Sequence, residues 1–293
     1  MTGIDSVDAT VGIDVGGTKC LGVLAAADGT VLAEQIRPTP HASELVTQLA
    51  SMARELGEGL PLGVGVPGLI THDGVITASP NLRGAHNVPV GPALRERLGG
   101  AVHVENDATA AAHGEWQAGA ARGARNALLV TLGTGIGGGI VMGGVLHRGA
   151  HGFAGEIGHM TVETDGMECL CGRRGCWERY ASGSALARMG GGRSGEDVVA
   201  AARAGDSESL RVVDEFARWV AVGVASLTNV VDPEVVVLGG GVIGAWDVWE
   251  EPLRRWTDSL LYASSARPRP RISAAALGAS AGAVGCALLA RDV

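Results

Sequence analysis

Three of the five cysteines in this 293-residue chain lie close together in sequence, at Cys169, Cys171 and Cys176. His159 precedes this group. Thiolates and imidazole are the ligands that zinc prefers, and four of them complete a tetrahedral structural site. In a cytosolic chain, clustered cysteines are more often metal ligands than disulfide partners. The stretch 152–178 therefore predicts a zinc-stapled loop, and the acidic side chains within it suggest that the loop also carries part of a binding site.

A second candidate for chemistry is Glu105-Asn106-Asp107, at the end of an expected strand over 101–107. Phosphoryl transfer needs positioning, charge neutralisation and one group that takes up the hydroxyl proton. Asp107 suits that last role, and a nearby helix N-terminus favours its ionised form. Aspartate also commonly caps helices at such positions, so spacing alone leaves both roles open.

Other polar residues can hydrogen-bond the hydroxyls of a polyol, which needs paired donors and acceptors. These residues are Asn81, Asn106, Glu156 and Glu178. Taken singly, each of them is more often a solvated surface or turn residue.

Three glycine-rich runs compete for a role in binding phosphate or nucleotide. The run DVGGTK at 14–19 lacks the P-loop spacing and continues as a strand. Its backbone N–H groups can hold phosphate, Thr18 and Lys19 add a hydroxyl and a charge, and Asp14 can orient Mg²⁺ through water. A plain hairpin with an exposed lysine is the alternative.

The other two runs formally match the dinucleotide pattern GxGxxG. That interpretation requires a helix after the glycines. The run at 133–139 continues as a strand, so we expect a phosphate-contacting hairpin there. The run at 239–244 follows a strand and precedes a helix. It can accept an adenosine, or it can be a tight turn where strand and helix pack.

Composition limits the function classes. The net charge of −8 argues against a nucleic-acid binder, because such proteins carry basic stripes. No apolar run reaches the roughly 20 residues of a membrane span, and the acidic N-terminus lacks a signal-peptide core. We therefore expect a cytoplasmic protein. Apolar residues make up 46 % and aromatic residues only 3 %, which predicts cores of Ala, Val and Leu.

The order of expected elements suggests a duplicated α/β domain around a central cleft. Two β-meanders, over 11–36 and 126–149, each open with a glycine-rich turn. Both are followed by alternating strands and helices, which predicts antiparallel meanders extended by parallel strands. The expected later elements are helices over 43–56, 91–98, 196–204, 207–230 and 246–261, a strand over 271–277 and a closing helix.

These stretches together resemble the ROK family of sugar kinases and repressors, and most closely its bacterial glucokinases. The resemblance covers almost the whole chain, and its motifs occur in the family's order and spacing. They are DVGGTK (14–19), VENDA (104–108), GTGIGGG (133–139), GEIGHM (155–160), CLCGRRGCWE (169–178) and LGGGV (238–242).

The resemblance implies an actin-like ATPase (ribonuclease H-like) duplicated fold with two lobes. Residues 1–110 would form the small lobe, with the helix at 279–293 packed on it. Residues 111–278 would form the large lobe, with the zinc loop and an oligomer interface. The implied reaction is ATP-dependent phosphorylation of glucose at its 6-hydroxyl, with catalytic Mg²⁺ and structural Zn²⁺.

The resemblance also implies roles by matching motif, with Asp107 as the general base. The implied sugar-binding residues are Asn81, Asn106, Asp107, Glu156, His159 and Glu178. The implied ATP-binding residues are Asp14, Gly16, Gly17, Thr18, Lys19, Gly133, Thr134, Gly135, Gly239, Gly240 and Gly241. The implied zinc ligands are His159, Cys169, Cys171 and Cys176.

Several alternatives stay open. His86 stands where glucokinases of this family often carry an aromatic residue, so N-acetylmannosamine, fructose or allose can replace glucose. Polyphosphate can replace ATP. Repressors of this family carry an N-terminal helix-turn-helix, for which we expect no room before Asp14. A sugar-binding module without catalysis is disfavoured by the candidate base. The expected partners are a hexose, ATP and further copies of the chain in a dimer or tetramer, without nucleic acid or membrane.

Overall fold

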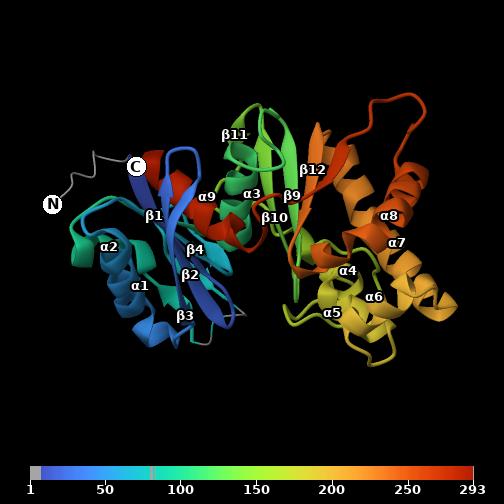
Figure 1. The fold of residues 1–293 in the computed structure, drawn as a ribbon, viewed down its shortest axis with the longest axis horizontal. Helices are drawn as coiled ribbons and strands as arrows, with labels where there is room; N and C mark the ends of the chain where they lie inside the picture. The colour runs from blue at the N-terminus through green and yellow to red at the C-terminus, as the bar shows by residue number, and fades with distance from the viewer. Residues whose placement is uncertain (1–7, 80–81, 83, 293) are drawn as a thin grey trace.

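A computed structural model describes residues 8–79, 82 and 84–292 of the chain. Two halves lie side by side along the longest axis, each containing a sheet flanked by helices (Figure 1). Within the described residues the strands form two five-stranded sheets and one three-stranded sheet. The α/β architecture expected from the sequence is confirmed, with one large sheet in each half.

The first sheet has the strand order β3-β2-β1-β4-β8. Its strands are β1 (Ala9–Val15), β2 (Lys19–Ala26), β3 (Val31–Pro38), β4 (Leu62–Val66) and β8 (Val102–Asn106). The first three run antiparallel as the predicted meander, and β4 and β8 extend them in parallel. Every residue of β4 is buried, as a central parallel strand requires.

The remaining elements of the first half cover this sheet and extend one end of it. They are α1 (Ala42–Gly57), α2 (Val90–Leu98) and a small sheet of β5 (Leu69–Ile70), β6 (Ile76–Ala78) and β7 (His86–Val88). Helix α1 begins at Ala42, one residue before the expected start at residue 43. His41 is the cap, because its Nδ1 accepts the N–H of Ser43 at 3.4 Å.

The second sheet repeats the topology of the first, in the order β11-β10-β9-β12-β13. Its strands are β9 (Ala127–Leu132), β10 (Ile136–Met142), β11 (Val145–Leu146), β12 (Val235–Gly239) and β13 (Arg271–Ala274). The last strand ends before the predicted residue 277. The reason is that the carboxylate of Glu115 accepts the N–H groups of Ala276 and Leu277, at 3.0 and 2.7 Å.

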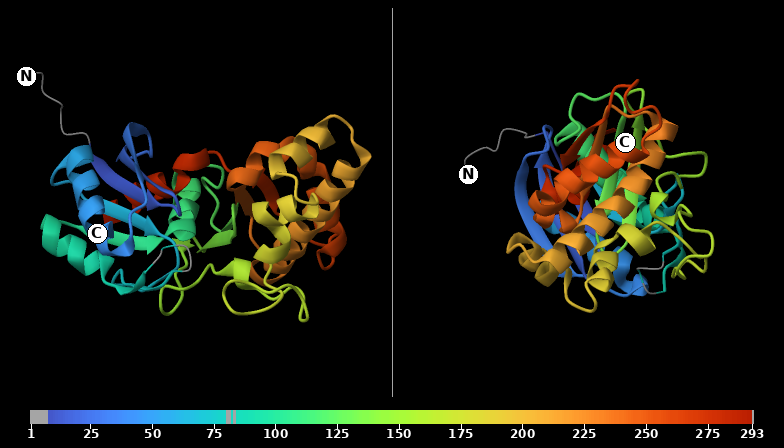
Figure 2. Two further views of the ribbon diagram at one scale, coloured as in Figure 1. Left: turned by 90° about the horizontal axis from the view of Figure 1, so that it is seen from below. Right: turned by 90° about the vertical axis from the view of Figure 1, so that its right-hand side faces the viewer.

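Helices cover the outer side of the second sheet (Figure 2). They are η1 (Ile157–His159), α4 (Glu178–Ala181), α5 (Gly183–Met189), α6 (Gly195–Arg203), α7 (Ser207–Val231), η2 (Gly241–Ala245) and α8 (Trp246–Leu260). Trp249 is buried and meets Phe216 edge to face, with ring centroids 5.7 Å apart. This tryptophan is therefore a core residue of the second half.

Two helices lie between the halves: α3 (Asp107–Gln117) and α9 (Ala281–Leu289), the latter flanked by η3 (Gly278–Ser280) and η4 (Ala290–Asp292) (Figure 1). Glycines allow them to approach closely. A Cβ on Gly285 would lie 1.8 Å from the Ala110 oxygen of α3, and one on Gly63 of β4 would lie 1.8 Å from the Cys286 oxygen. Among the described helices, none is long and apolar enough to cross a membrane.

Candidate active site and metal site

One cavity of about 690 Å³ collects most of the residues that the sequence singled out. Both large sheets, the loop after β11 and helices α3 and α9 contribute to its wall. The predicted residues that line it are Asp14, Gly17, Thr18, Asn106, Asp107, Gly133, Thr134, Gly135, Glu156, His159, Cys171, Glu178, Gly239 and Gly240. Residues far apart in the sequence thus share one wall, as a site between two halves requires.

Six predicted residues are not among those seen in this wall. Asn81 lies outside the described residues. Gly16, Lys19, Gly241, Cys169 and Cys176 do not line the cavity. The Gly16 N–H donates to the Lys19 oxygen at 2.9 Å, so these two residues close the first glycine turn. Cys169 and Cys176 are buried behind the exposed Cys171.

The β8–α3 junction carries the candidate base. The sequence left open whether Asp107 caps this helix, and the cap is Asn106 instead. The Oδ1 of Asn106 accepts the Thr109 N–H at 3.0 Å, and its amide nitrogen donates to the Gly68 oxygen at 3.2 Å. Asp107 is the first helical residue, and its Oδ1 accepts the Ala108 N–H at 2.9 Å.

Two carboxyl groups at the cavity have raised pKa values. Burial raises the pKa of Asp107, and the N–H bonds at the start of α3 offset only part of that effect. The helix N-terminus thus favours the ionised form of Asp107, as expected, but burial has the larger effect on its pKa. Burial, and then the charge of Asp107, raise the pKa of Asp14 to about 7, while Lys19 lowers it. The Oδ1 of Asp14 is buried without a hydrogen-bond partner.

The glycine runs form hairpin turns in both sheets, as predicted. One joins β1 to β2, and the other joins β9 to β10, where the Gly133 N–H donates to the Gly135 oxygen at 3.0 Å. The third run begins a 3₁₀ turn before α8. Gly240 has φ +85°, and a Cβ there would lie 2.5 Å from the Leu132 oxygen. Only glycine allows this close approach, which brings the third run against the second hairpin.

Two glutamates and a histidine form the opposite part of the wall. The Nε2 of His159 lies 3.9 Å from an oxygen of Glu156, and its Nδ1 lies 4.0 Å from an oxygen of Glu178. Burial raises the pKa of Glu156, His159 lowers it, and the charges of Asp107 and Glu178 raise it further. The group offers several acceptors and one ring N–H to a polar ligand.

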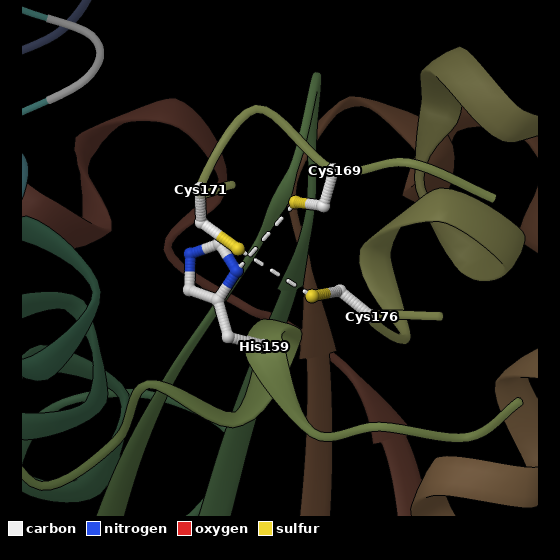
Figure 3. Close-up of side chains that lie close together, drawn as sticks. All are labelled: His159, Cys169, Cys171 and Cys176. Atoms are coloured by element: carbon white, nitrogen blue, oxygen red, sulfur yellow. Dashed lines mark hydrogen bonds between the residues drawn. The ribbon is translucent and has the colours of Figure 1, made fainter. Parts of the chain in front are cut away.

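The side chains of His159 and three cysteines converge beside this group (Figure 3). Their ligand atoms all lie within 4.8 Å of one another. The Cys171 and Cys176 sulfurs are 3.6 Å apart, and the Cys169 sulfur lies 3.8 Å from Nδ1 of His159. Zinc–sulfur bonds of about 2.3 Å at tetrahedral angles place ligand atoms roughly 3.8 Å apart. The four side chains therefore fit a tetrahedral zinc ion.

Sequence reasoning missed several residues of the cavity wall. They include Gly68, Glu115, Thr131, Gly155, Arg179, Ser184 and Gly282. One of them carried a signal, because Thr131 precedes its glycine turn by two residues, as Asp14 does. The others are placed by tertiary contacts that no local pattern reveals.

Comparison with known proteins gives relatives over the whole chain. The sequence model of the ROK family matches residues 10–293. A glucokinase of Streptomyces coelicolor is 36% identical over 310 residues, which cover 97% of this chain and 98% of that protein. The xylose repressor of Bacillus subtilis is 32% identical, over 86% of this chain and 69% of its own.

A solved structure gives the same result for the fold. The ROK family glucokinase from Streptomyces griseus, in complex with glucose and AMPPNP, matches with a TM-score of 0.87 and 35% identity. The match covers 97% of this chain and 100% of that one.

Proposed function

Because the chain belongs to the ROK family and has its actin-like ATPase fold, we propose that it transfers the γ-phosphoryl group of ATP to the 6-hydroxyl of glucose. One observation carries the proposal. The half-buried carboxylate of Asp107, two glycine hairpins and a group of two glutamates and a histidine line a single cavity. The glucokinase relatives, similar over nearly their full length, support the same reaction.

In the proposed reaction the 6-hydroxyl oxygen attacks the γ-phosphorus, and the bond to the β-phosphate oxygen breaks to release ADP. Asp107 accepts the hydroxyl proton as the new O–P bond forms. Its raised pKa makes the carboxylate a better proton acceptor than an exposed aspartate. In the hairpins 16–19 and 133–135, the backbone N–H groups of the cavity-lining residues Gly17, Thr18, Thr134 and Gly135 would hold the phosphates. In the run 239–241, Gly239 and Gly240 would line the adenosine pocket.

Mg²⁺ bound with ATP would neutralise charge on the β- and γ-phosphates. Asp14 would hold it through water. The buried Oδ1 of Asp14, without a hydrogen-bond partner, supports this assignment because such an atom needs a cation or water.

The sugar would be held by Asn81, Asn106, Asp107, Glu156, His159 and Glu178. We assign Nδ1 of His159 to zinc and Nε2 to the sugar, since Nδ1 faces the Cys169 sulfur and Nε2 faces Glu156. A metal that fixes one ring nitrogen orients the other. Zinc would then stabilise the loop and set the direction of a sugar contact, without touching the phosphate.

We further propose that residues 1–110 with helix 279–293 form the small lobe, and that 111–278 form the large lobe. The contacts of α9 with β1 and β4 support this division. The large lobe would also carry the interface of a dimer or tetramer, consistent with exposed apolar side chains at Val230 and Tyr262. Light scattering of the purified protein would measure that state.

A coupled assay of sugar phosphate formation tests the function. Glucose, fructose, allose and N-acetylmannosamine would each be offered with ATP and with polyphosphate. We expect the highest kcat/KM for glucose with ATP. A different best sugar would correct the substrate, and turnover with polyphosphate alone would correct the donor. Sugar binding by calorimetry without turnover on any pair would instead support a non-catalytic sensor.

A further inference from the structure

The loop after β11 begins in the second half but is attached to the first. The Nε of Arg148 lies 2.5 Å from an oxygen of Glu105, a residue of β8. The Gly149 oxygen lies 3.1 Å from a ring nitrogen of His72, in the turn after β5. Gly152 packs so closely that a Cβ there would lie 2.3 Å from the Ile70 oxygen. In Figure 2 this yellow-green segment runs between the two halves.

Glu105 is almost completely buried, with 1% of its side chain exposed, whereas 21% of the Arg148 side chain is exposed. The two oxygens of this carboxylate serve different elements. One pairs with Arg148, and the other accepts the backbone N–H of Asn106 at 2.9 Å. His103 lies 3.5 Å from the oxygen that Arg148 contacts. A single buried carboxylate therefore joins the loop to the strand end that carries the candidate base.

The same loop leads within a few residues from Arg148 to Glu156, one of the proposed sugar contacts. The Ala154 N–H donates to the Arg148 oxygen at 3.1 Å, which closes the loop on itself. Gly155 then packs on β10, where a Cβ would lie 2.5 Å from the Gly138 oxygen. The next residue is Glu156, in the cavity wall. The backbone that leads to Glu156 is thus supported at two points, by β10 at Gly155 and by the first half at Arg148.

We propose that the Glu105–Arg148 ion pair is a positioning device, which sets the distance between the sugar contacts of Glu156 and those of Asn106 and Asp107. The inference rests on the proposed function, because it assigns these residues to one sugar. The device acts on the acceptor site, since the pair contacts neither glycine hairpin. A misplacement of about 1 Å can cost roughly 100-fold in rate, so the pair matters although it does not line the cavity.

The test is a double-mutant cycle with E105Q, R148M and the double variant E105Q/R148M, with R148K as the conservative variant. Sugar affinity is measured by calorimetry without ATP, KM is measured for sugar and ATP, and thermal denaturation reports stability. The control is R203M, which removes a more exposed ion pair of the same 2.5 Å length, between Arg203 of α6 and Asp247 of α8, away from the loop.

We expect R148M to lower kcat/KM for the sugar by up to roughly 100-fold. It should also weaken sugar affinity, leave KM for ATP within about twofold and lower the melting temperature. The double variant should recover the melting temperature, because Glu105 is then no longer a buried unpaired charge. It should not recover sugar affinity. R148K should lie between wild type and R148M, and R203M should match wild type in sugar affinity.

Two results would overturn the inference. One is unchanged sugar affinity in folded R148M. The other is sugar affinity that recovers together with the melting temperature in the double variant, which indicates a purely structural pair. A wild-type protein that neither binds nor phosphorylates any hexose would instead overturn the proposed function.

Discussion

The two halves of the molecule use one backbone plan for two kinds of chemistry. In both sheets the first strand ends in a glycine hairpin that lines the cavity. The residue two positions before the first glycine is Asp14 in one half and Thr131 in the other. Asp14 is a half-buried carboxyl with a raised pKa, whereas the hydroxyl of Thr131 accepts the Gly137 N–H at 3.2 Å.

The difference extends beyond the hairpins. The first half adds a second half-buried carboxyl, Asp107, directly after its last parallel strand. The second half adds instead the long insertion after β11, with Glu156, Glu178 and the cysteine cluster. The shared turn supplies backbone N–H groups, and the side chains around it decide the chemistry. Under the proposed function, the first half would carry proton transfer and hold magnesium, and the second half would supply Glu156, His159 and Glu178 to the sugar.

The strongest test of the difference between the two halves is a substitution of Asp107. Asp107→Asn keeps the shape but cannot take up a proton, so we expect kcat to fall by about 100- to 10,000-fold. The coupled assay measures this, with circular dichroism to verify folding. Asp28→Asn is the matched control, because Asp28 is exposed and asparagine can accept the same Thr30 N–H bond in its turn. A near-wild-type kcat for Asp107→Asn would remove the base from the first half.

Metal removal tests the chemistry assigned to the second half. Cys171→Ser replaces the exposed cysteine of the cluster, and we expect at least a tenfold loss in zinc affinity and a higher KM for sugar. Mass spectrometry of the metal content gives the first result, and the coupled assay gives the second. Cys20→Ala, in the core of the first half, should keep full zinc content. Intact sugar affinity in zinc-free protein would show that sugar recognition does not depend on the metal.

The charge on Asp14 predicts a pH dependence of stability. Its folded pKa of about 7 lies above its ordinary value of 3.8, so the folded state holds an extra proton between these pH values. The resulting stability is present below pH 4 and is lost as pH rises through 7, by up to about 4 kcal/mol. Asp14→Asn should therefore gain stability over wild type from pH 5 to pH 8 in magnesium-free urea denaturation.

Thr131, which occupies the position of Asp14 in the second half, provides the control for this pH dependence of stability. Thr131→Val removes a hydroxyl that does not titrate, so its stability difference from wild type should be the same at pH 5 and pH 8. A pH-independent difference for Asp14→Asn as well would show that the two hairpins do not differ in electrostatics.

Local patterns in the sequence predicted the frame of both halves. Glycine turns, alternating apolar residues and capping residues act over a few positions, so the meanders and most helices followed from them. The antiparallel order of the second meander and the helix expected over 196–204 are examples. The ROK family and the glucokinase relatives confirm the resemblance drawn from the six motifs.

Hydrogen bonds and ion pairs between side chains and groups far away in the sequence could not be predicted. Asn106 and Asp107 are equally good caps, and only the packing of the β8–α3 junction decides between them. Glu115 ends β13 by binding N–H groups of a segment far along the chain. Arg148 of the second half forms an ion pair with Glu105 of the first half. Each choice depends on which distant groups are buried nearby, and the sequence does not encode that locally.

A smaller effect should appear at Glu156, on the recognition side. Glu156→Gln keeps the size of the side chain but loses a charged acceptor, so we expect KM for sugar to rise roughly tenfold and KM for ATP to stay constant. Glu163→Gln, an exposed residue of the same insertion, should leave both constants unchanged. An equal rise in both KM values would assign Glu156 to the donor as well.

The smallest effect is expected at Lys19, the residue that most distinguishes the first hairpin from the second in charge. Lys19 is exposed and does not line the cavity, so Lys19→Met should raise KM for ATP by no more than about fivefold. Its charge also lowers the pKa of Asp14, so its removal should move the acid limb of the rate profile to higher pH. A large loss of turnover without that movement would mean that Lys19 contacts the donor directly, and the first hairpin would then bind phosphate through charge where the second uses only its backbone.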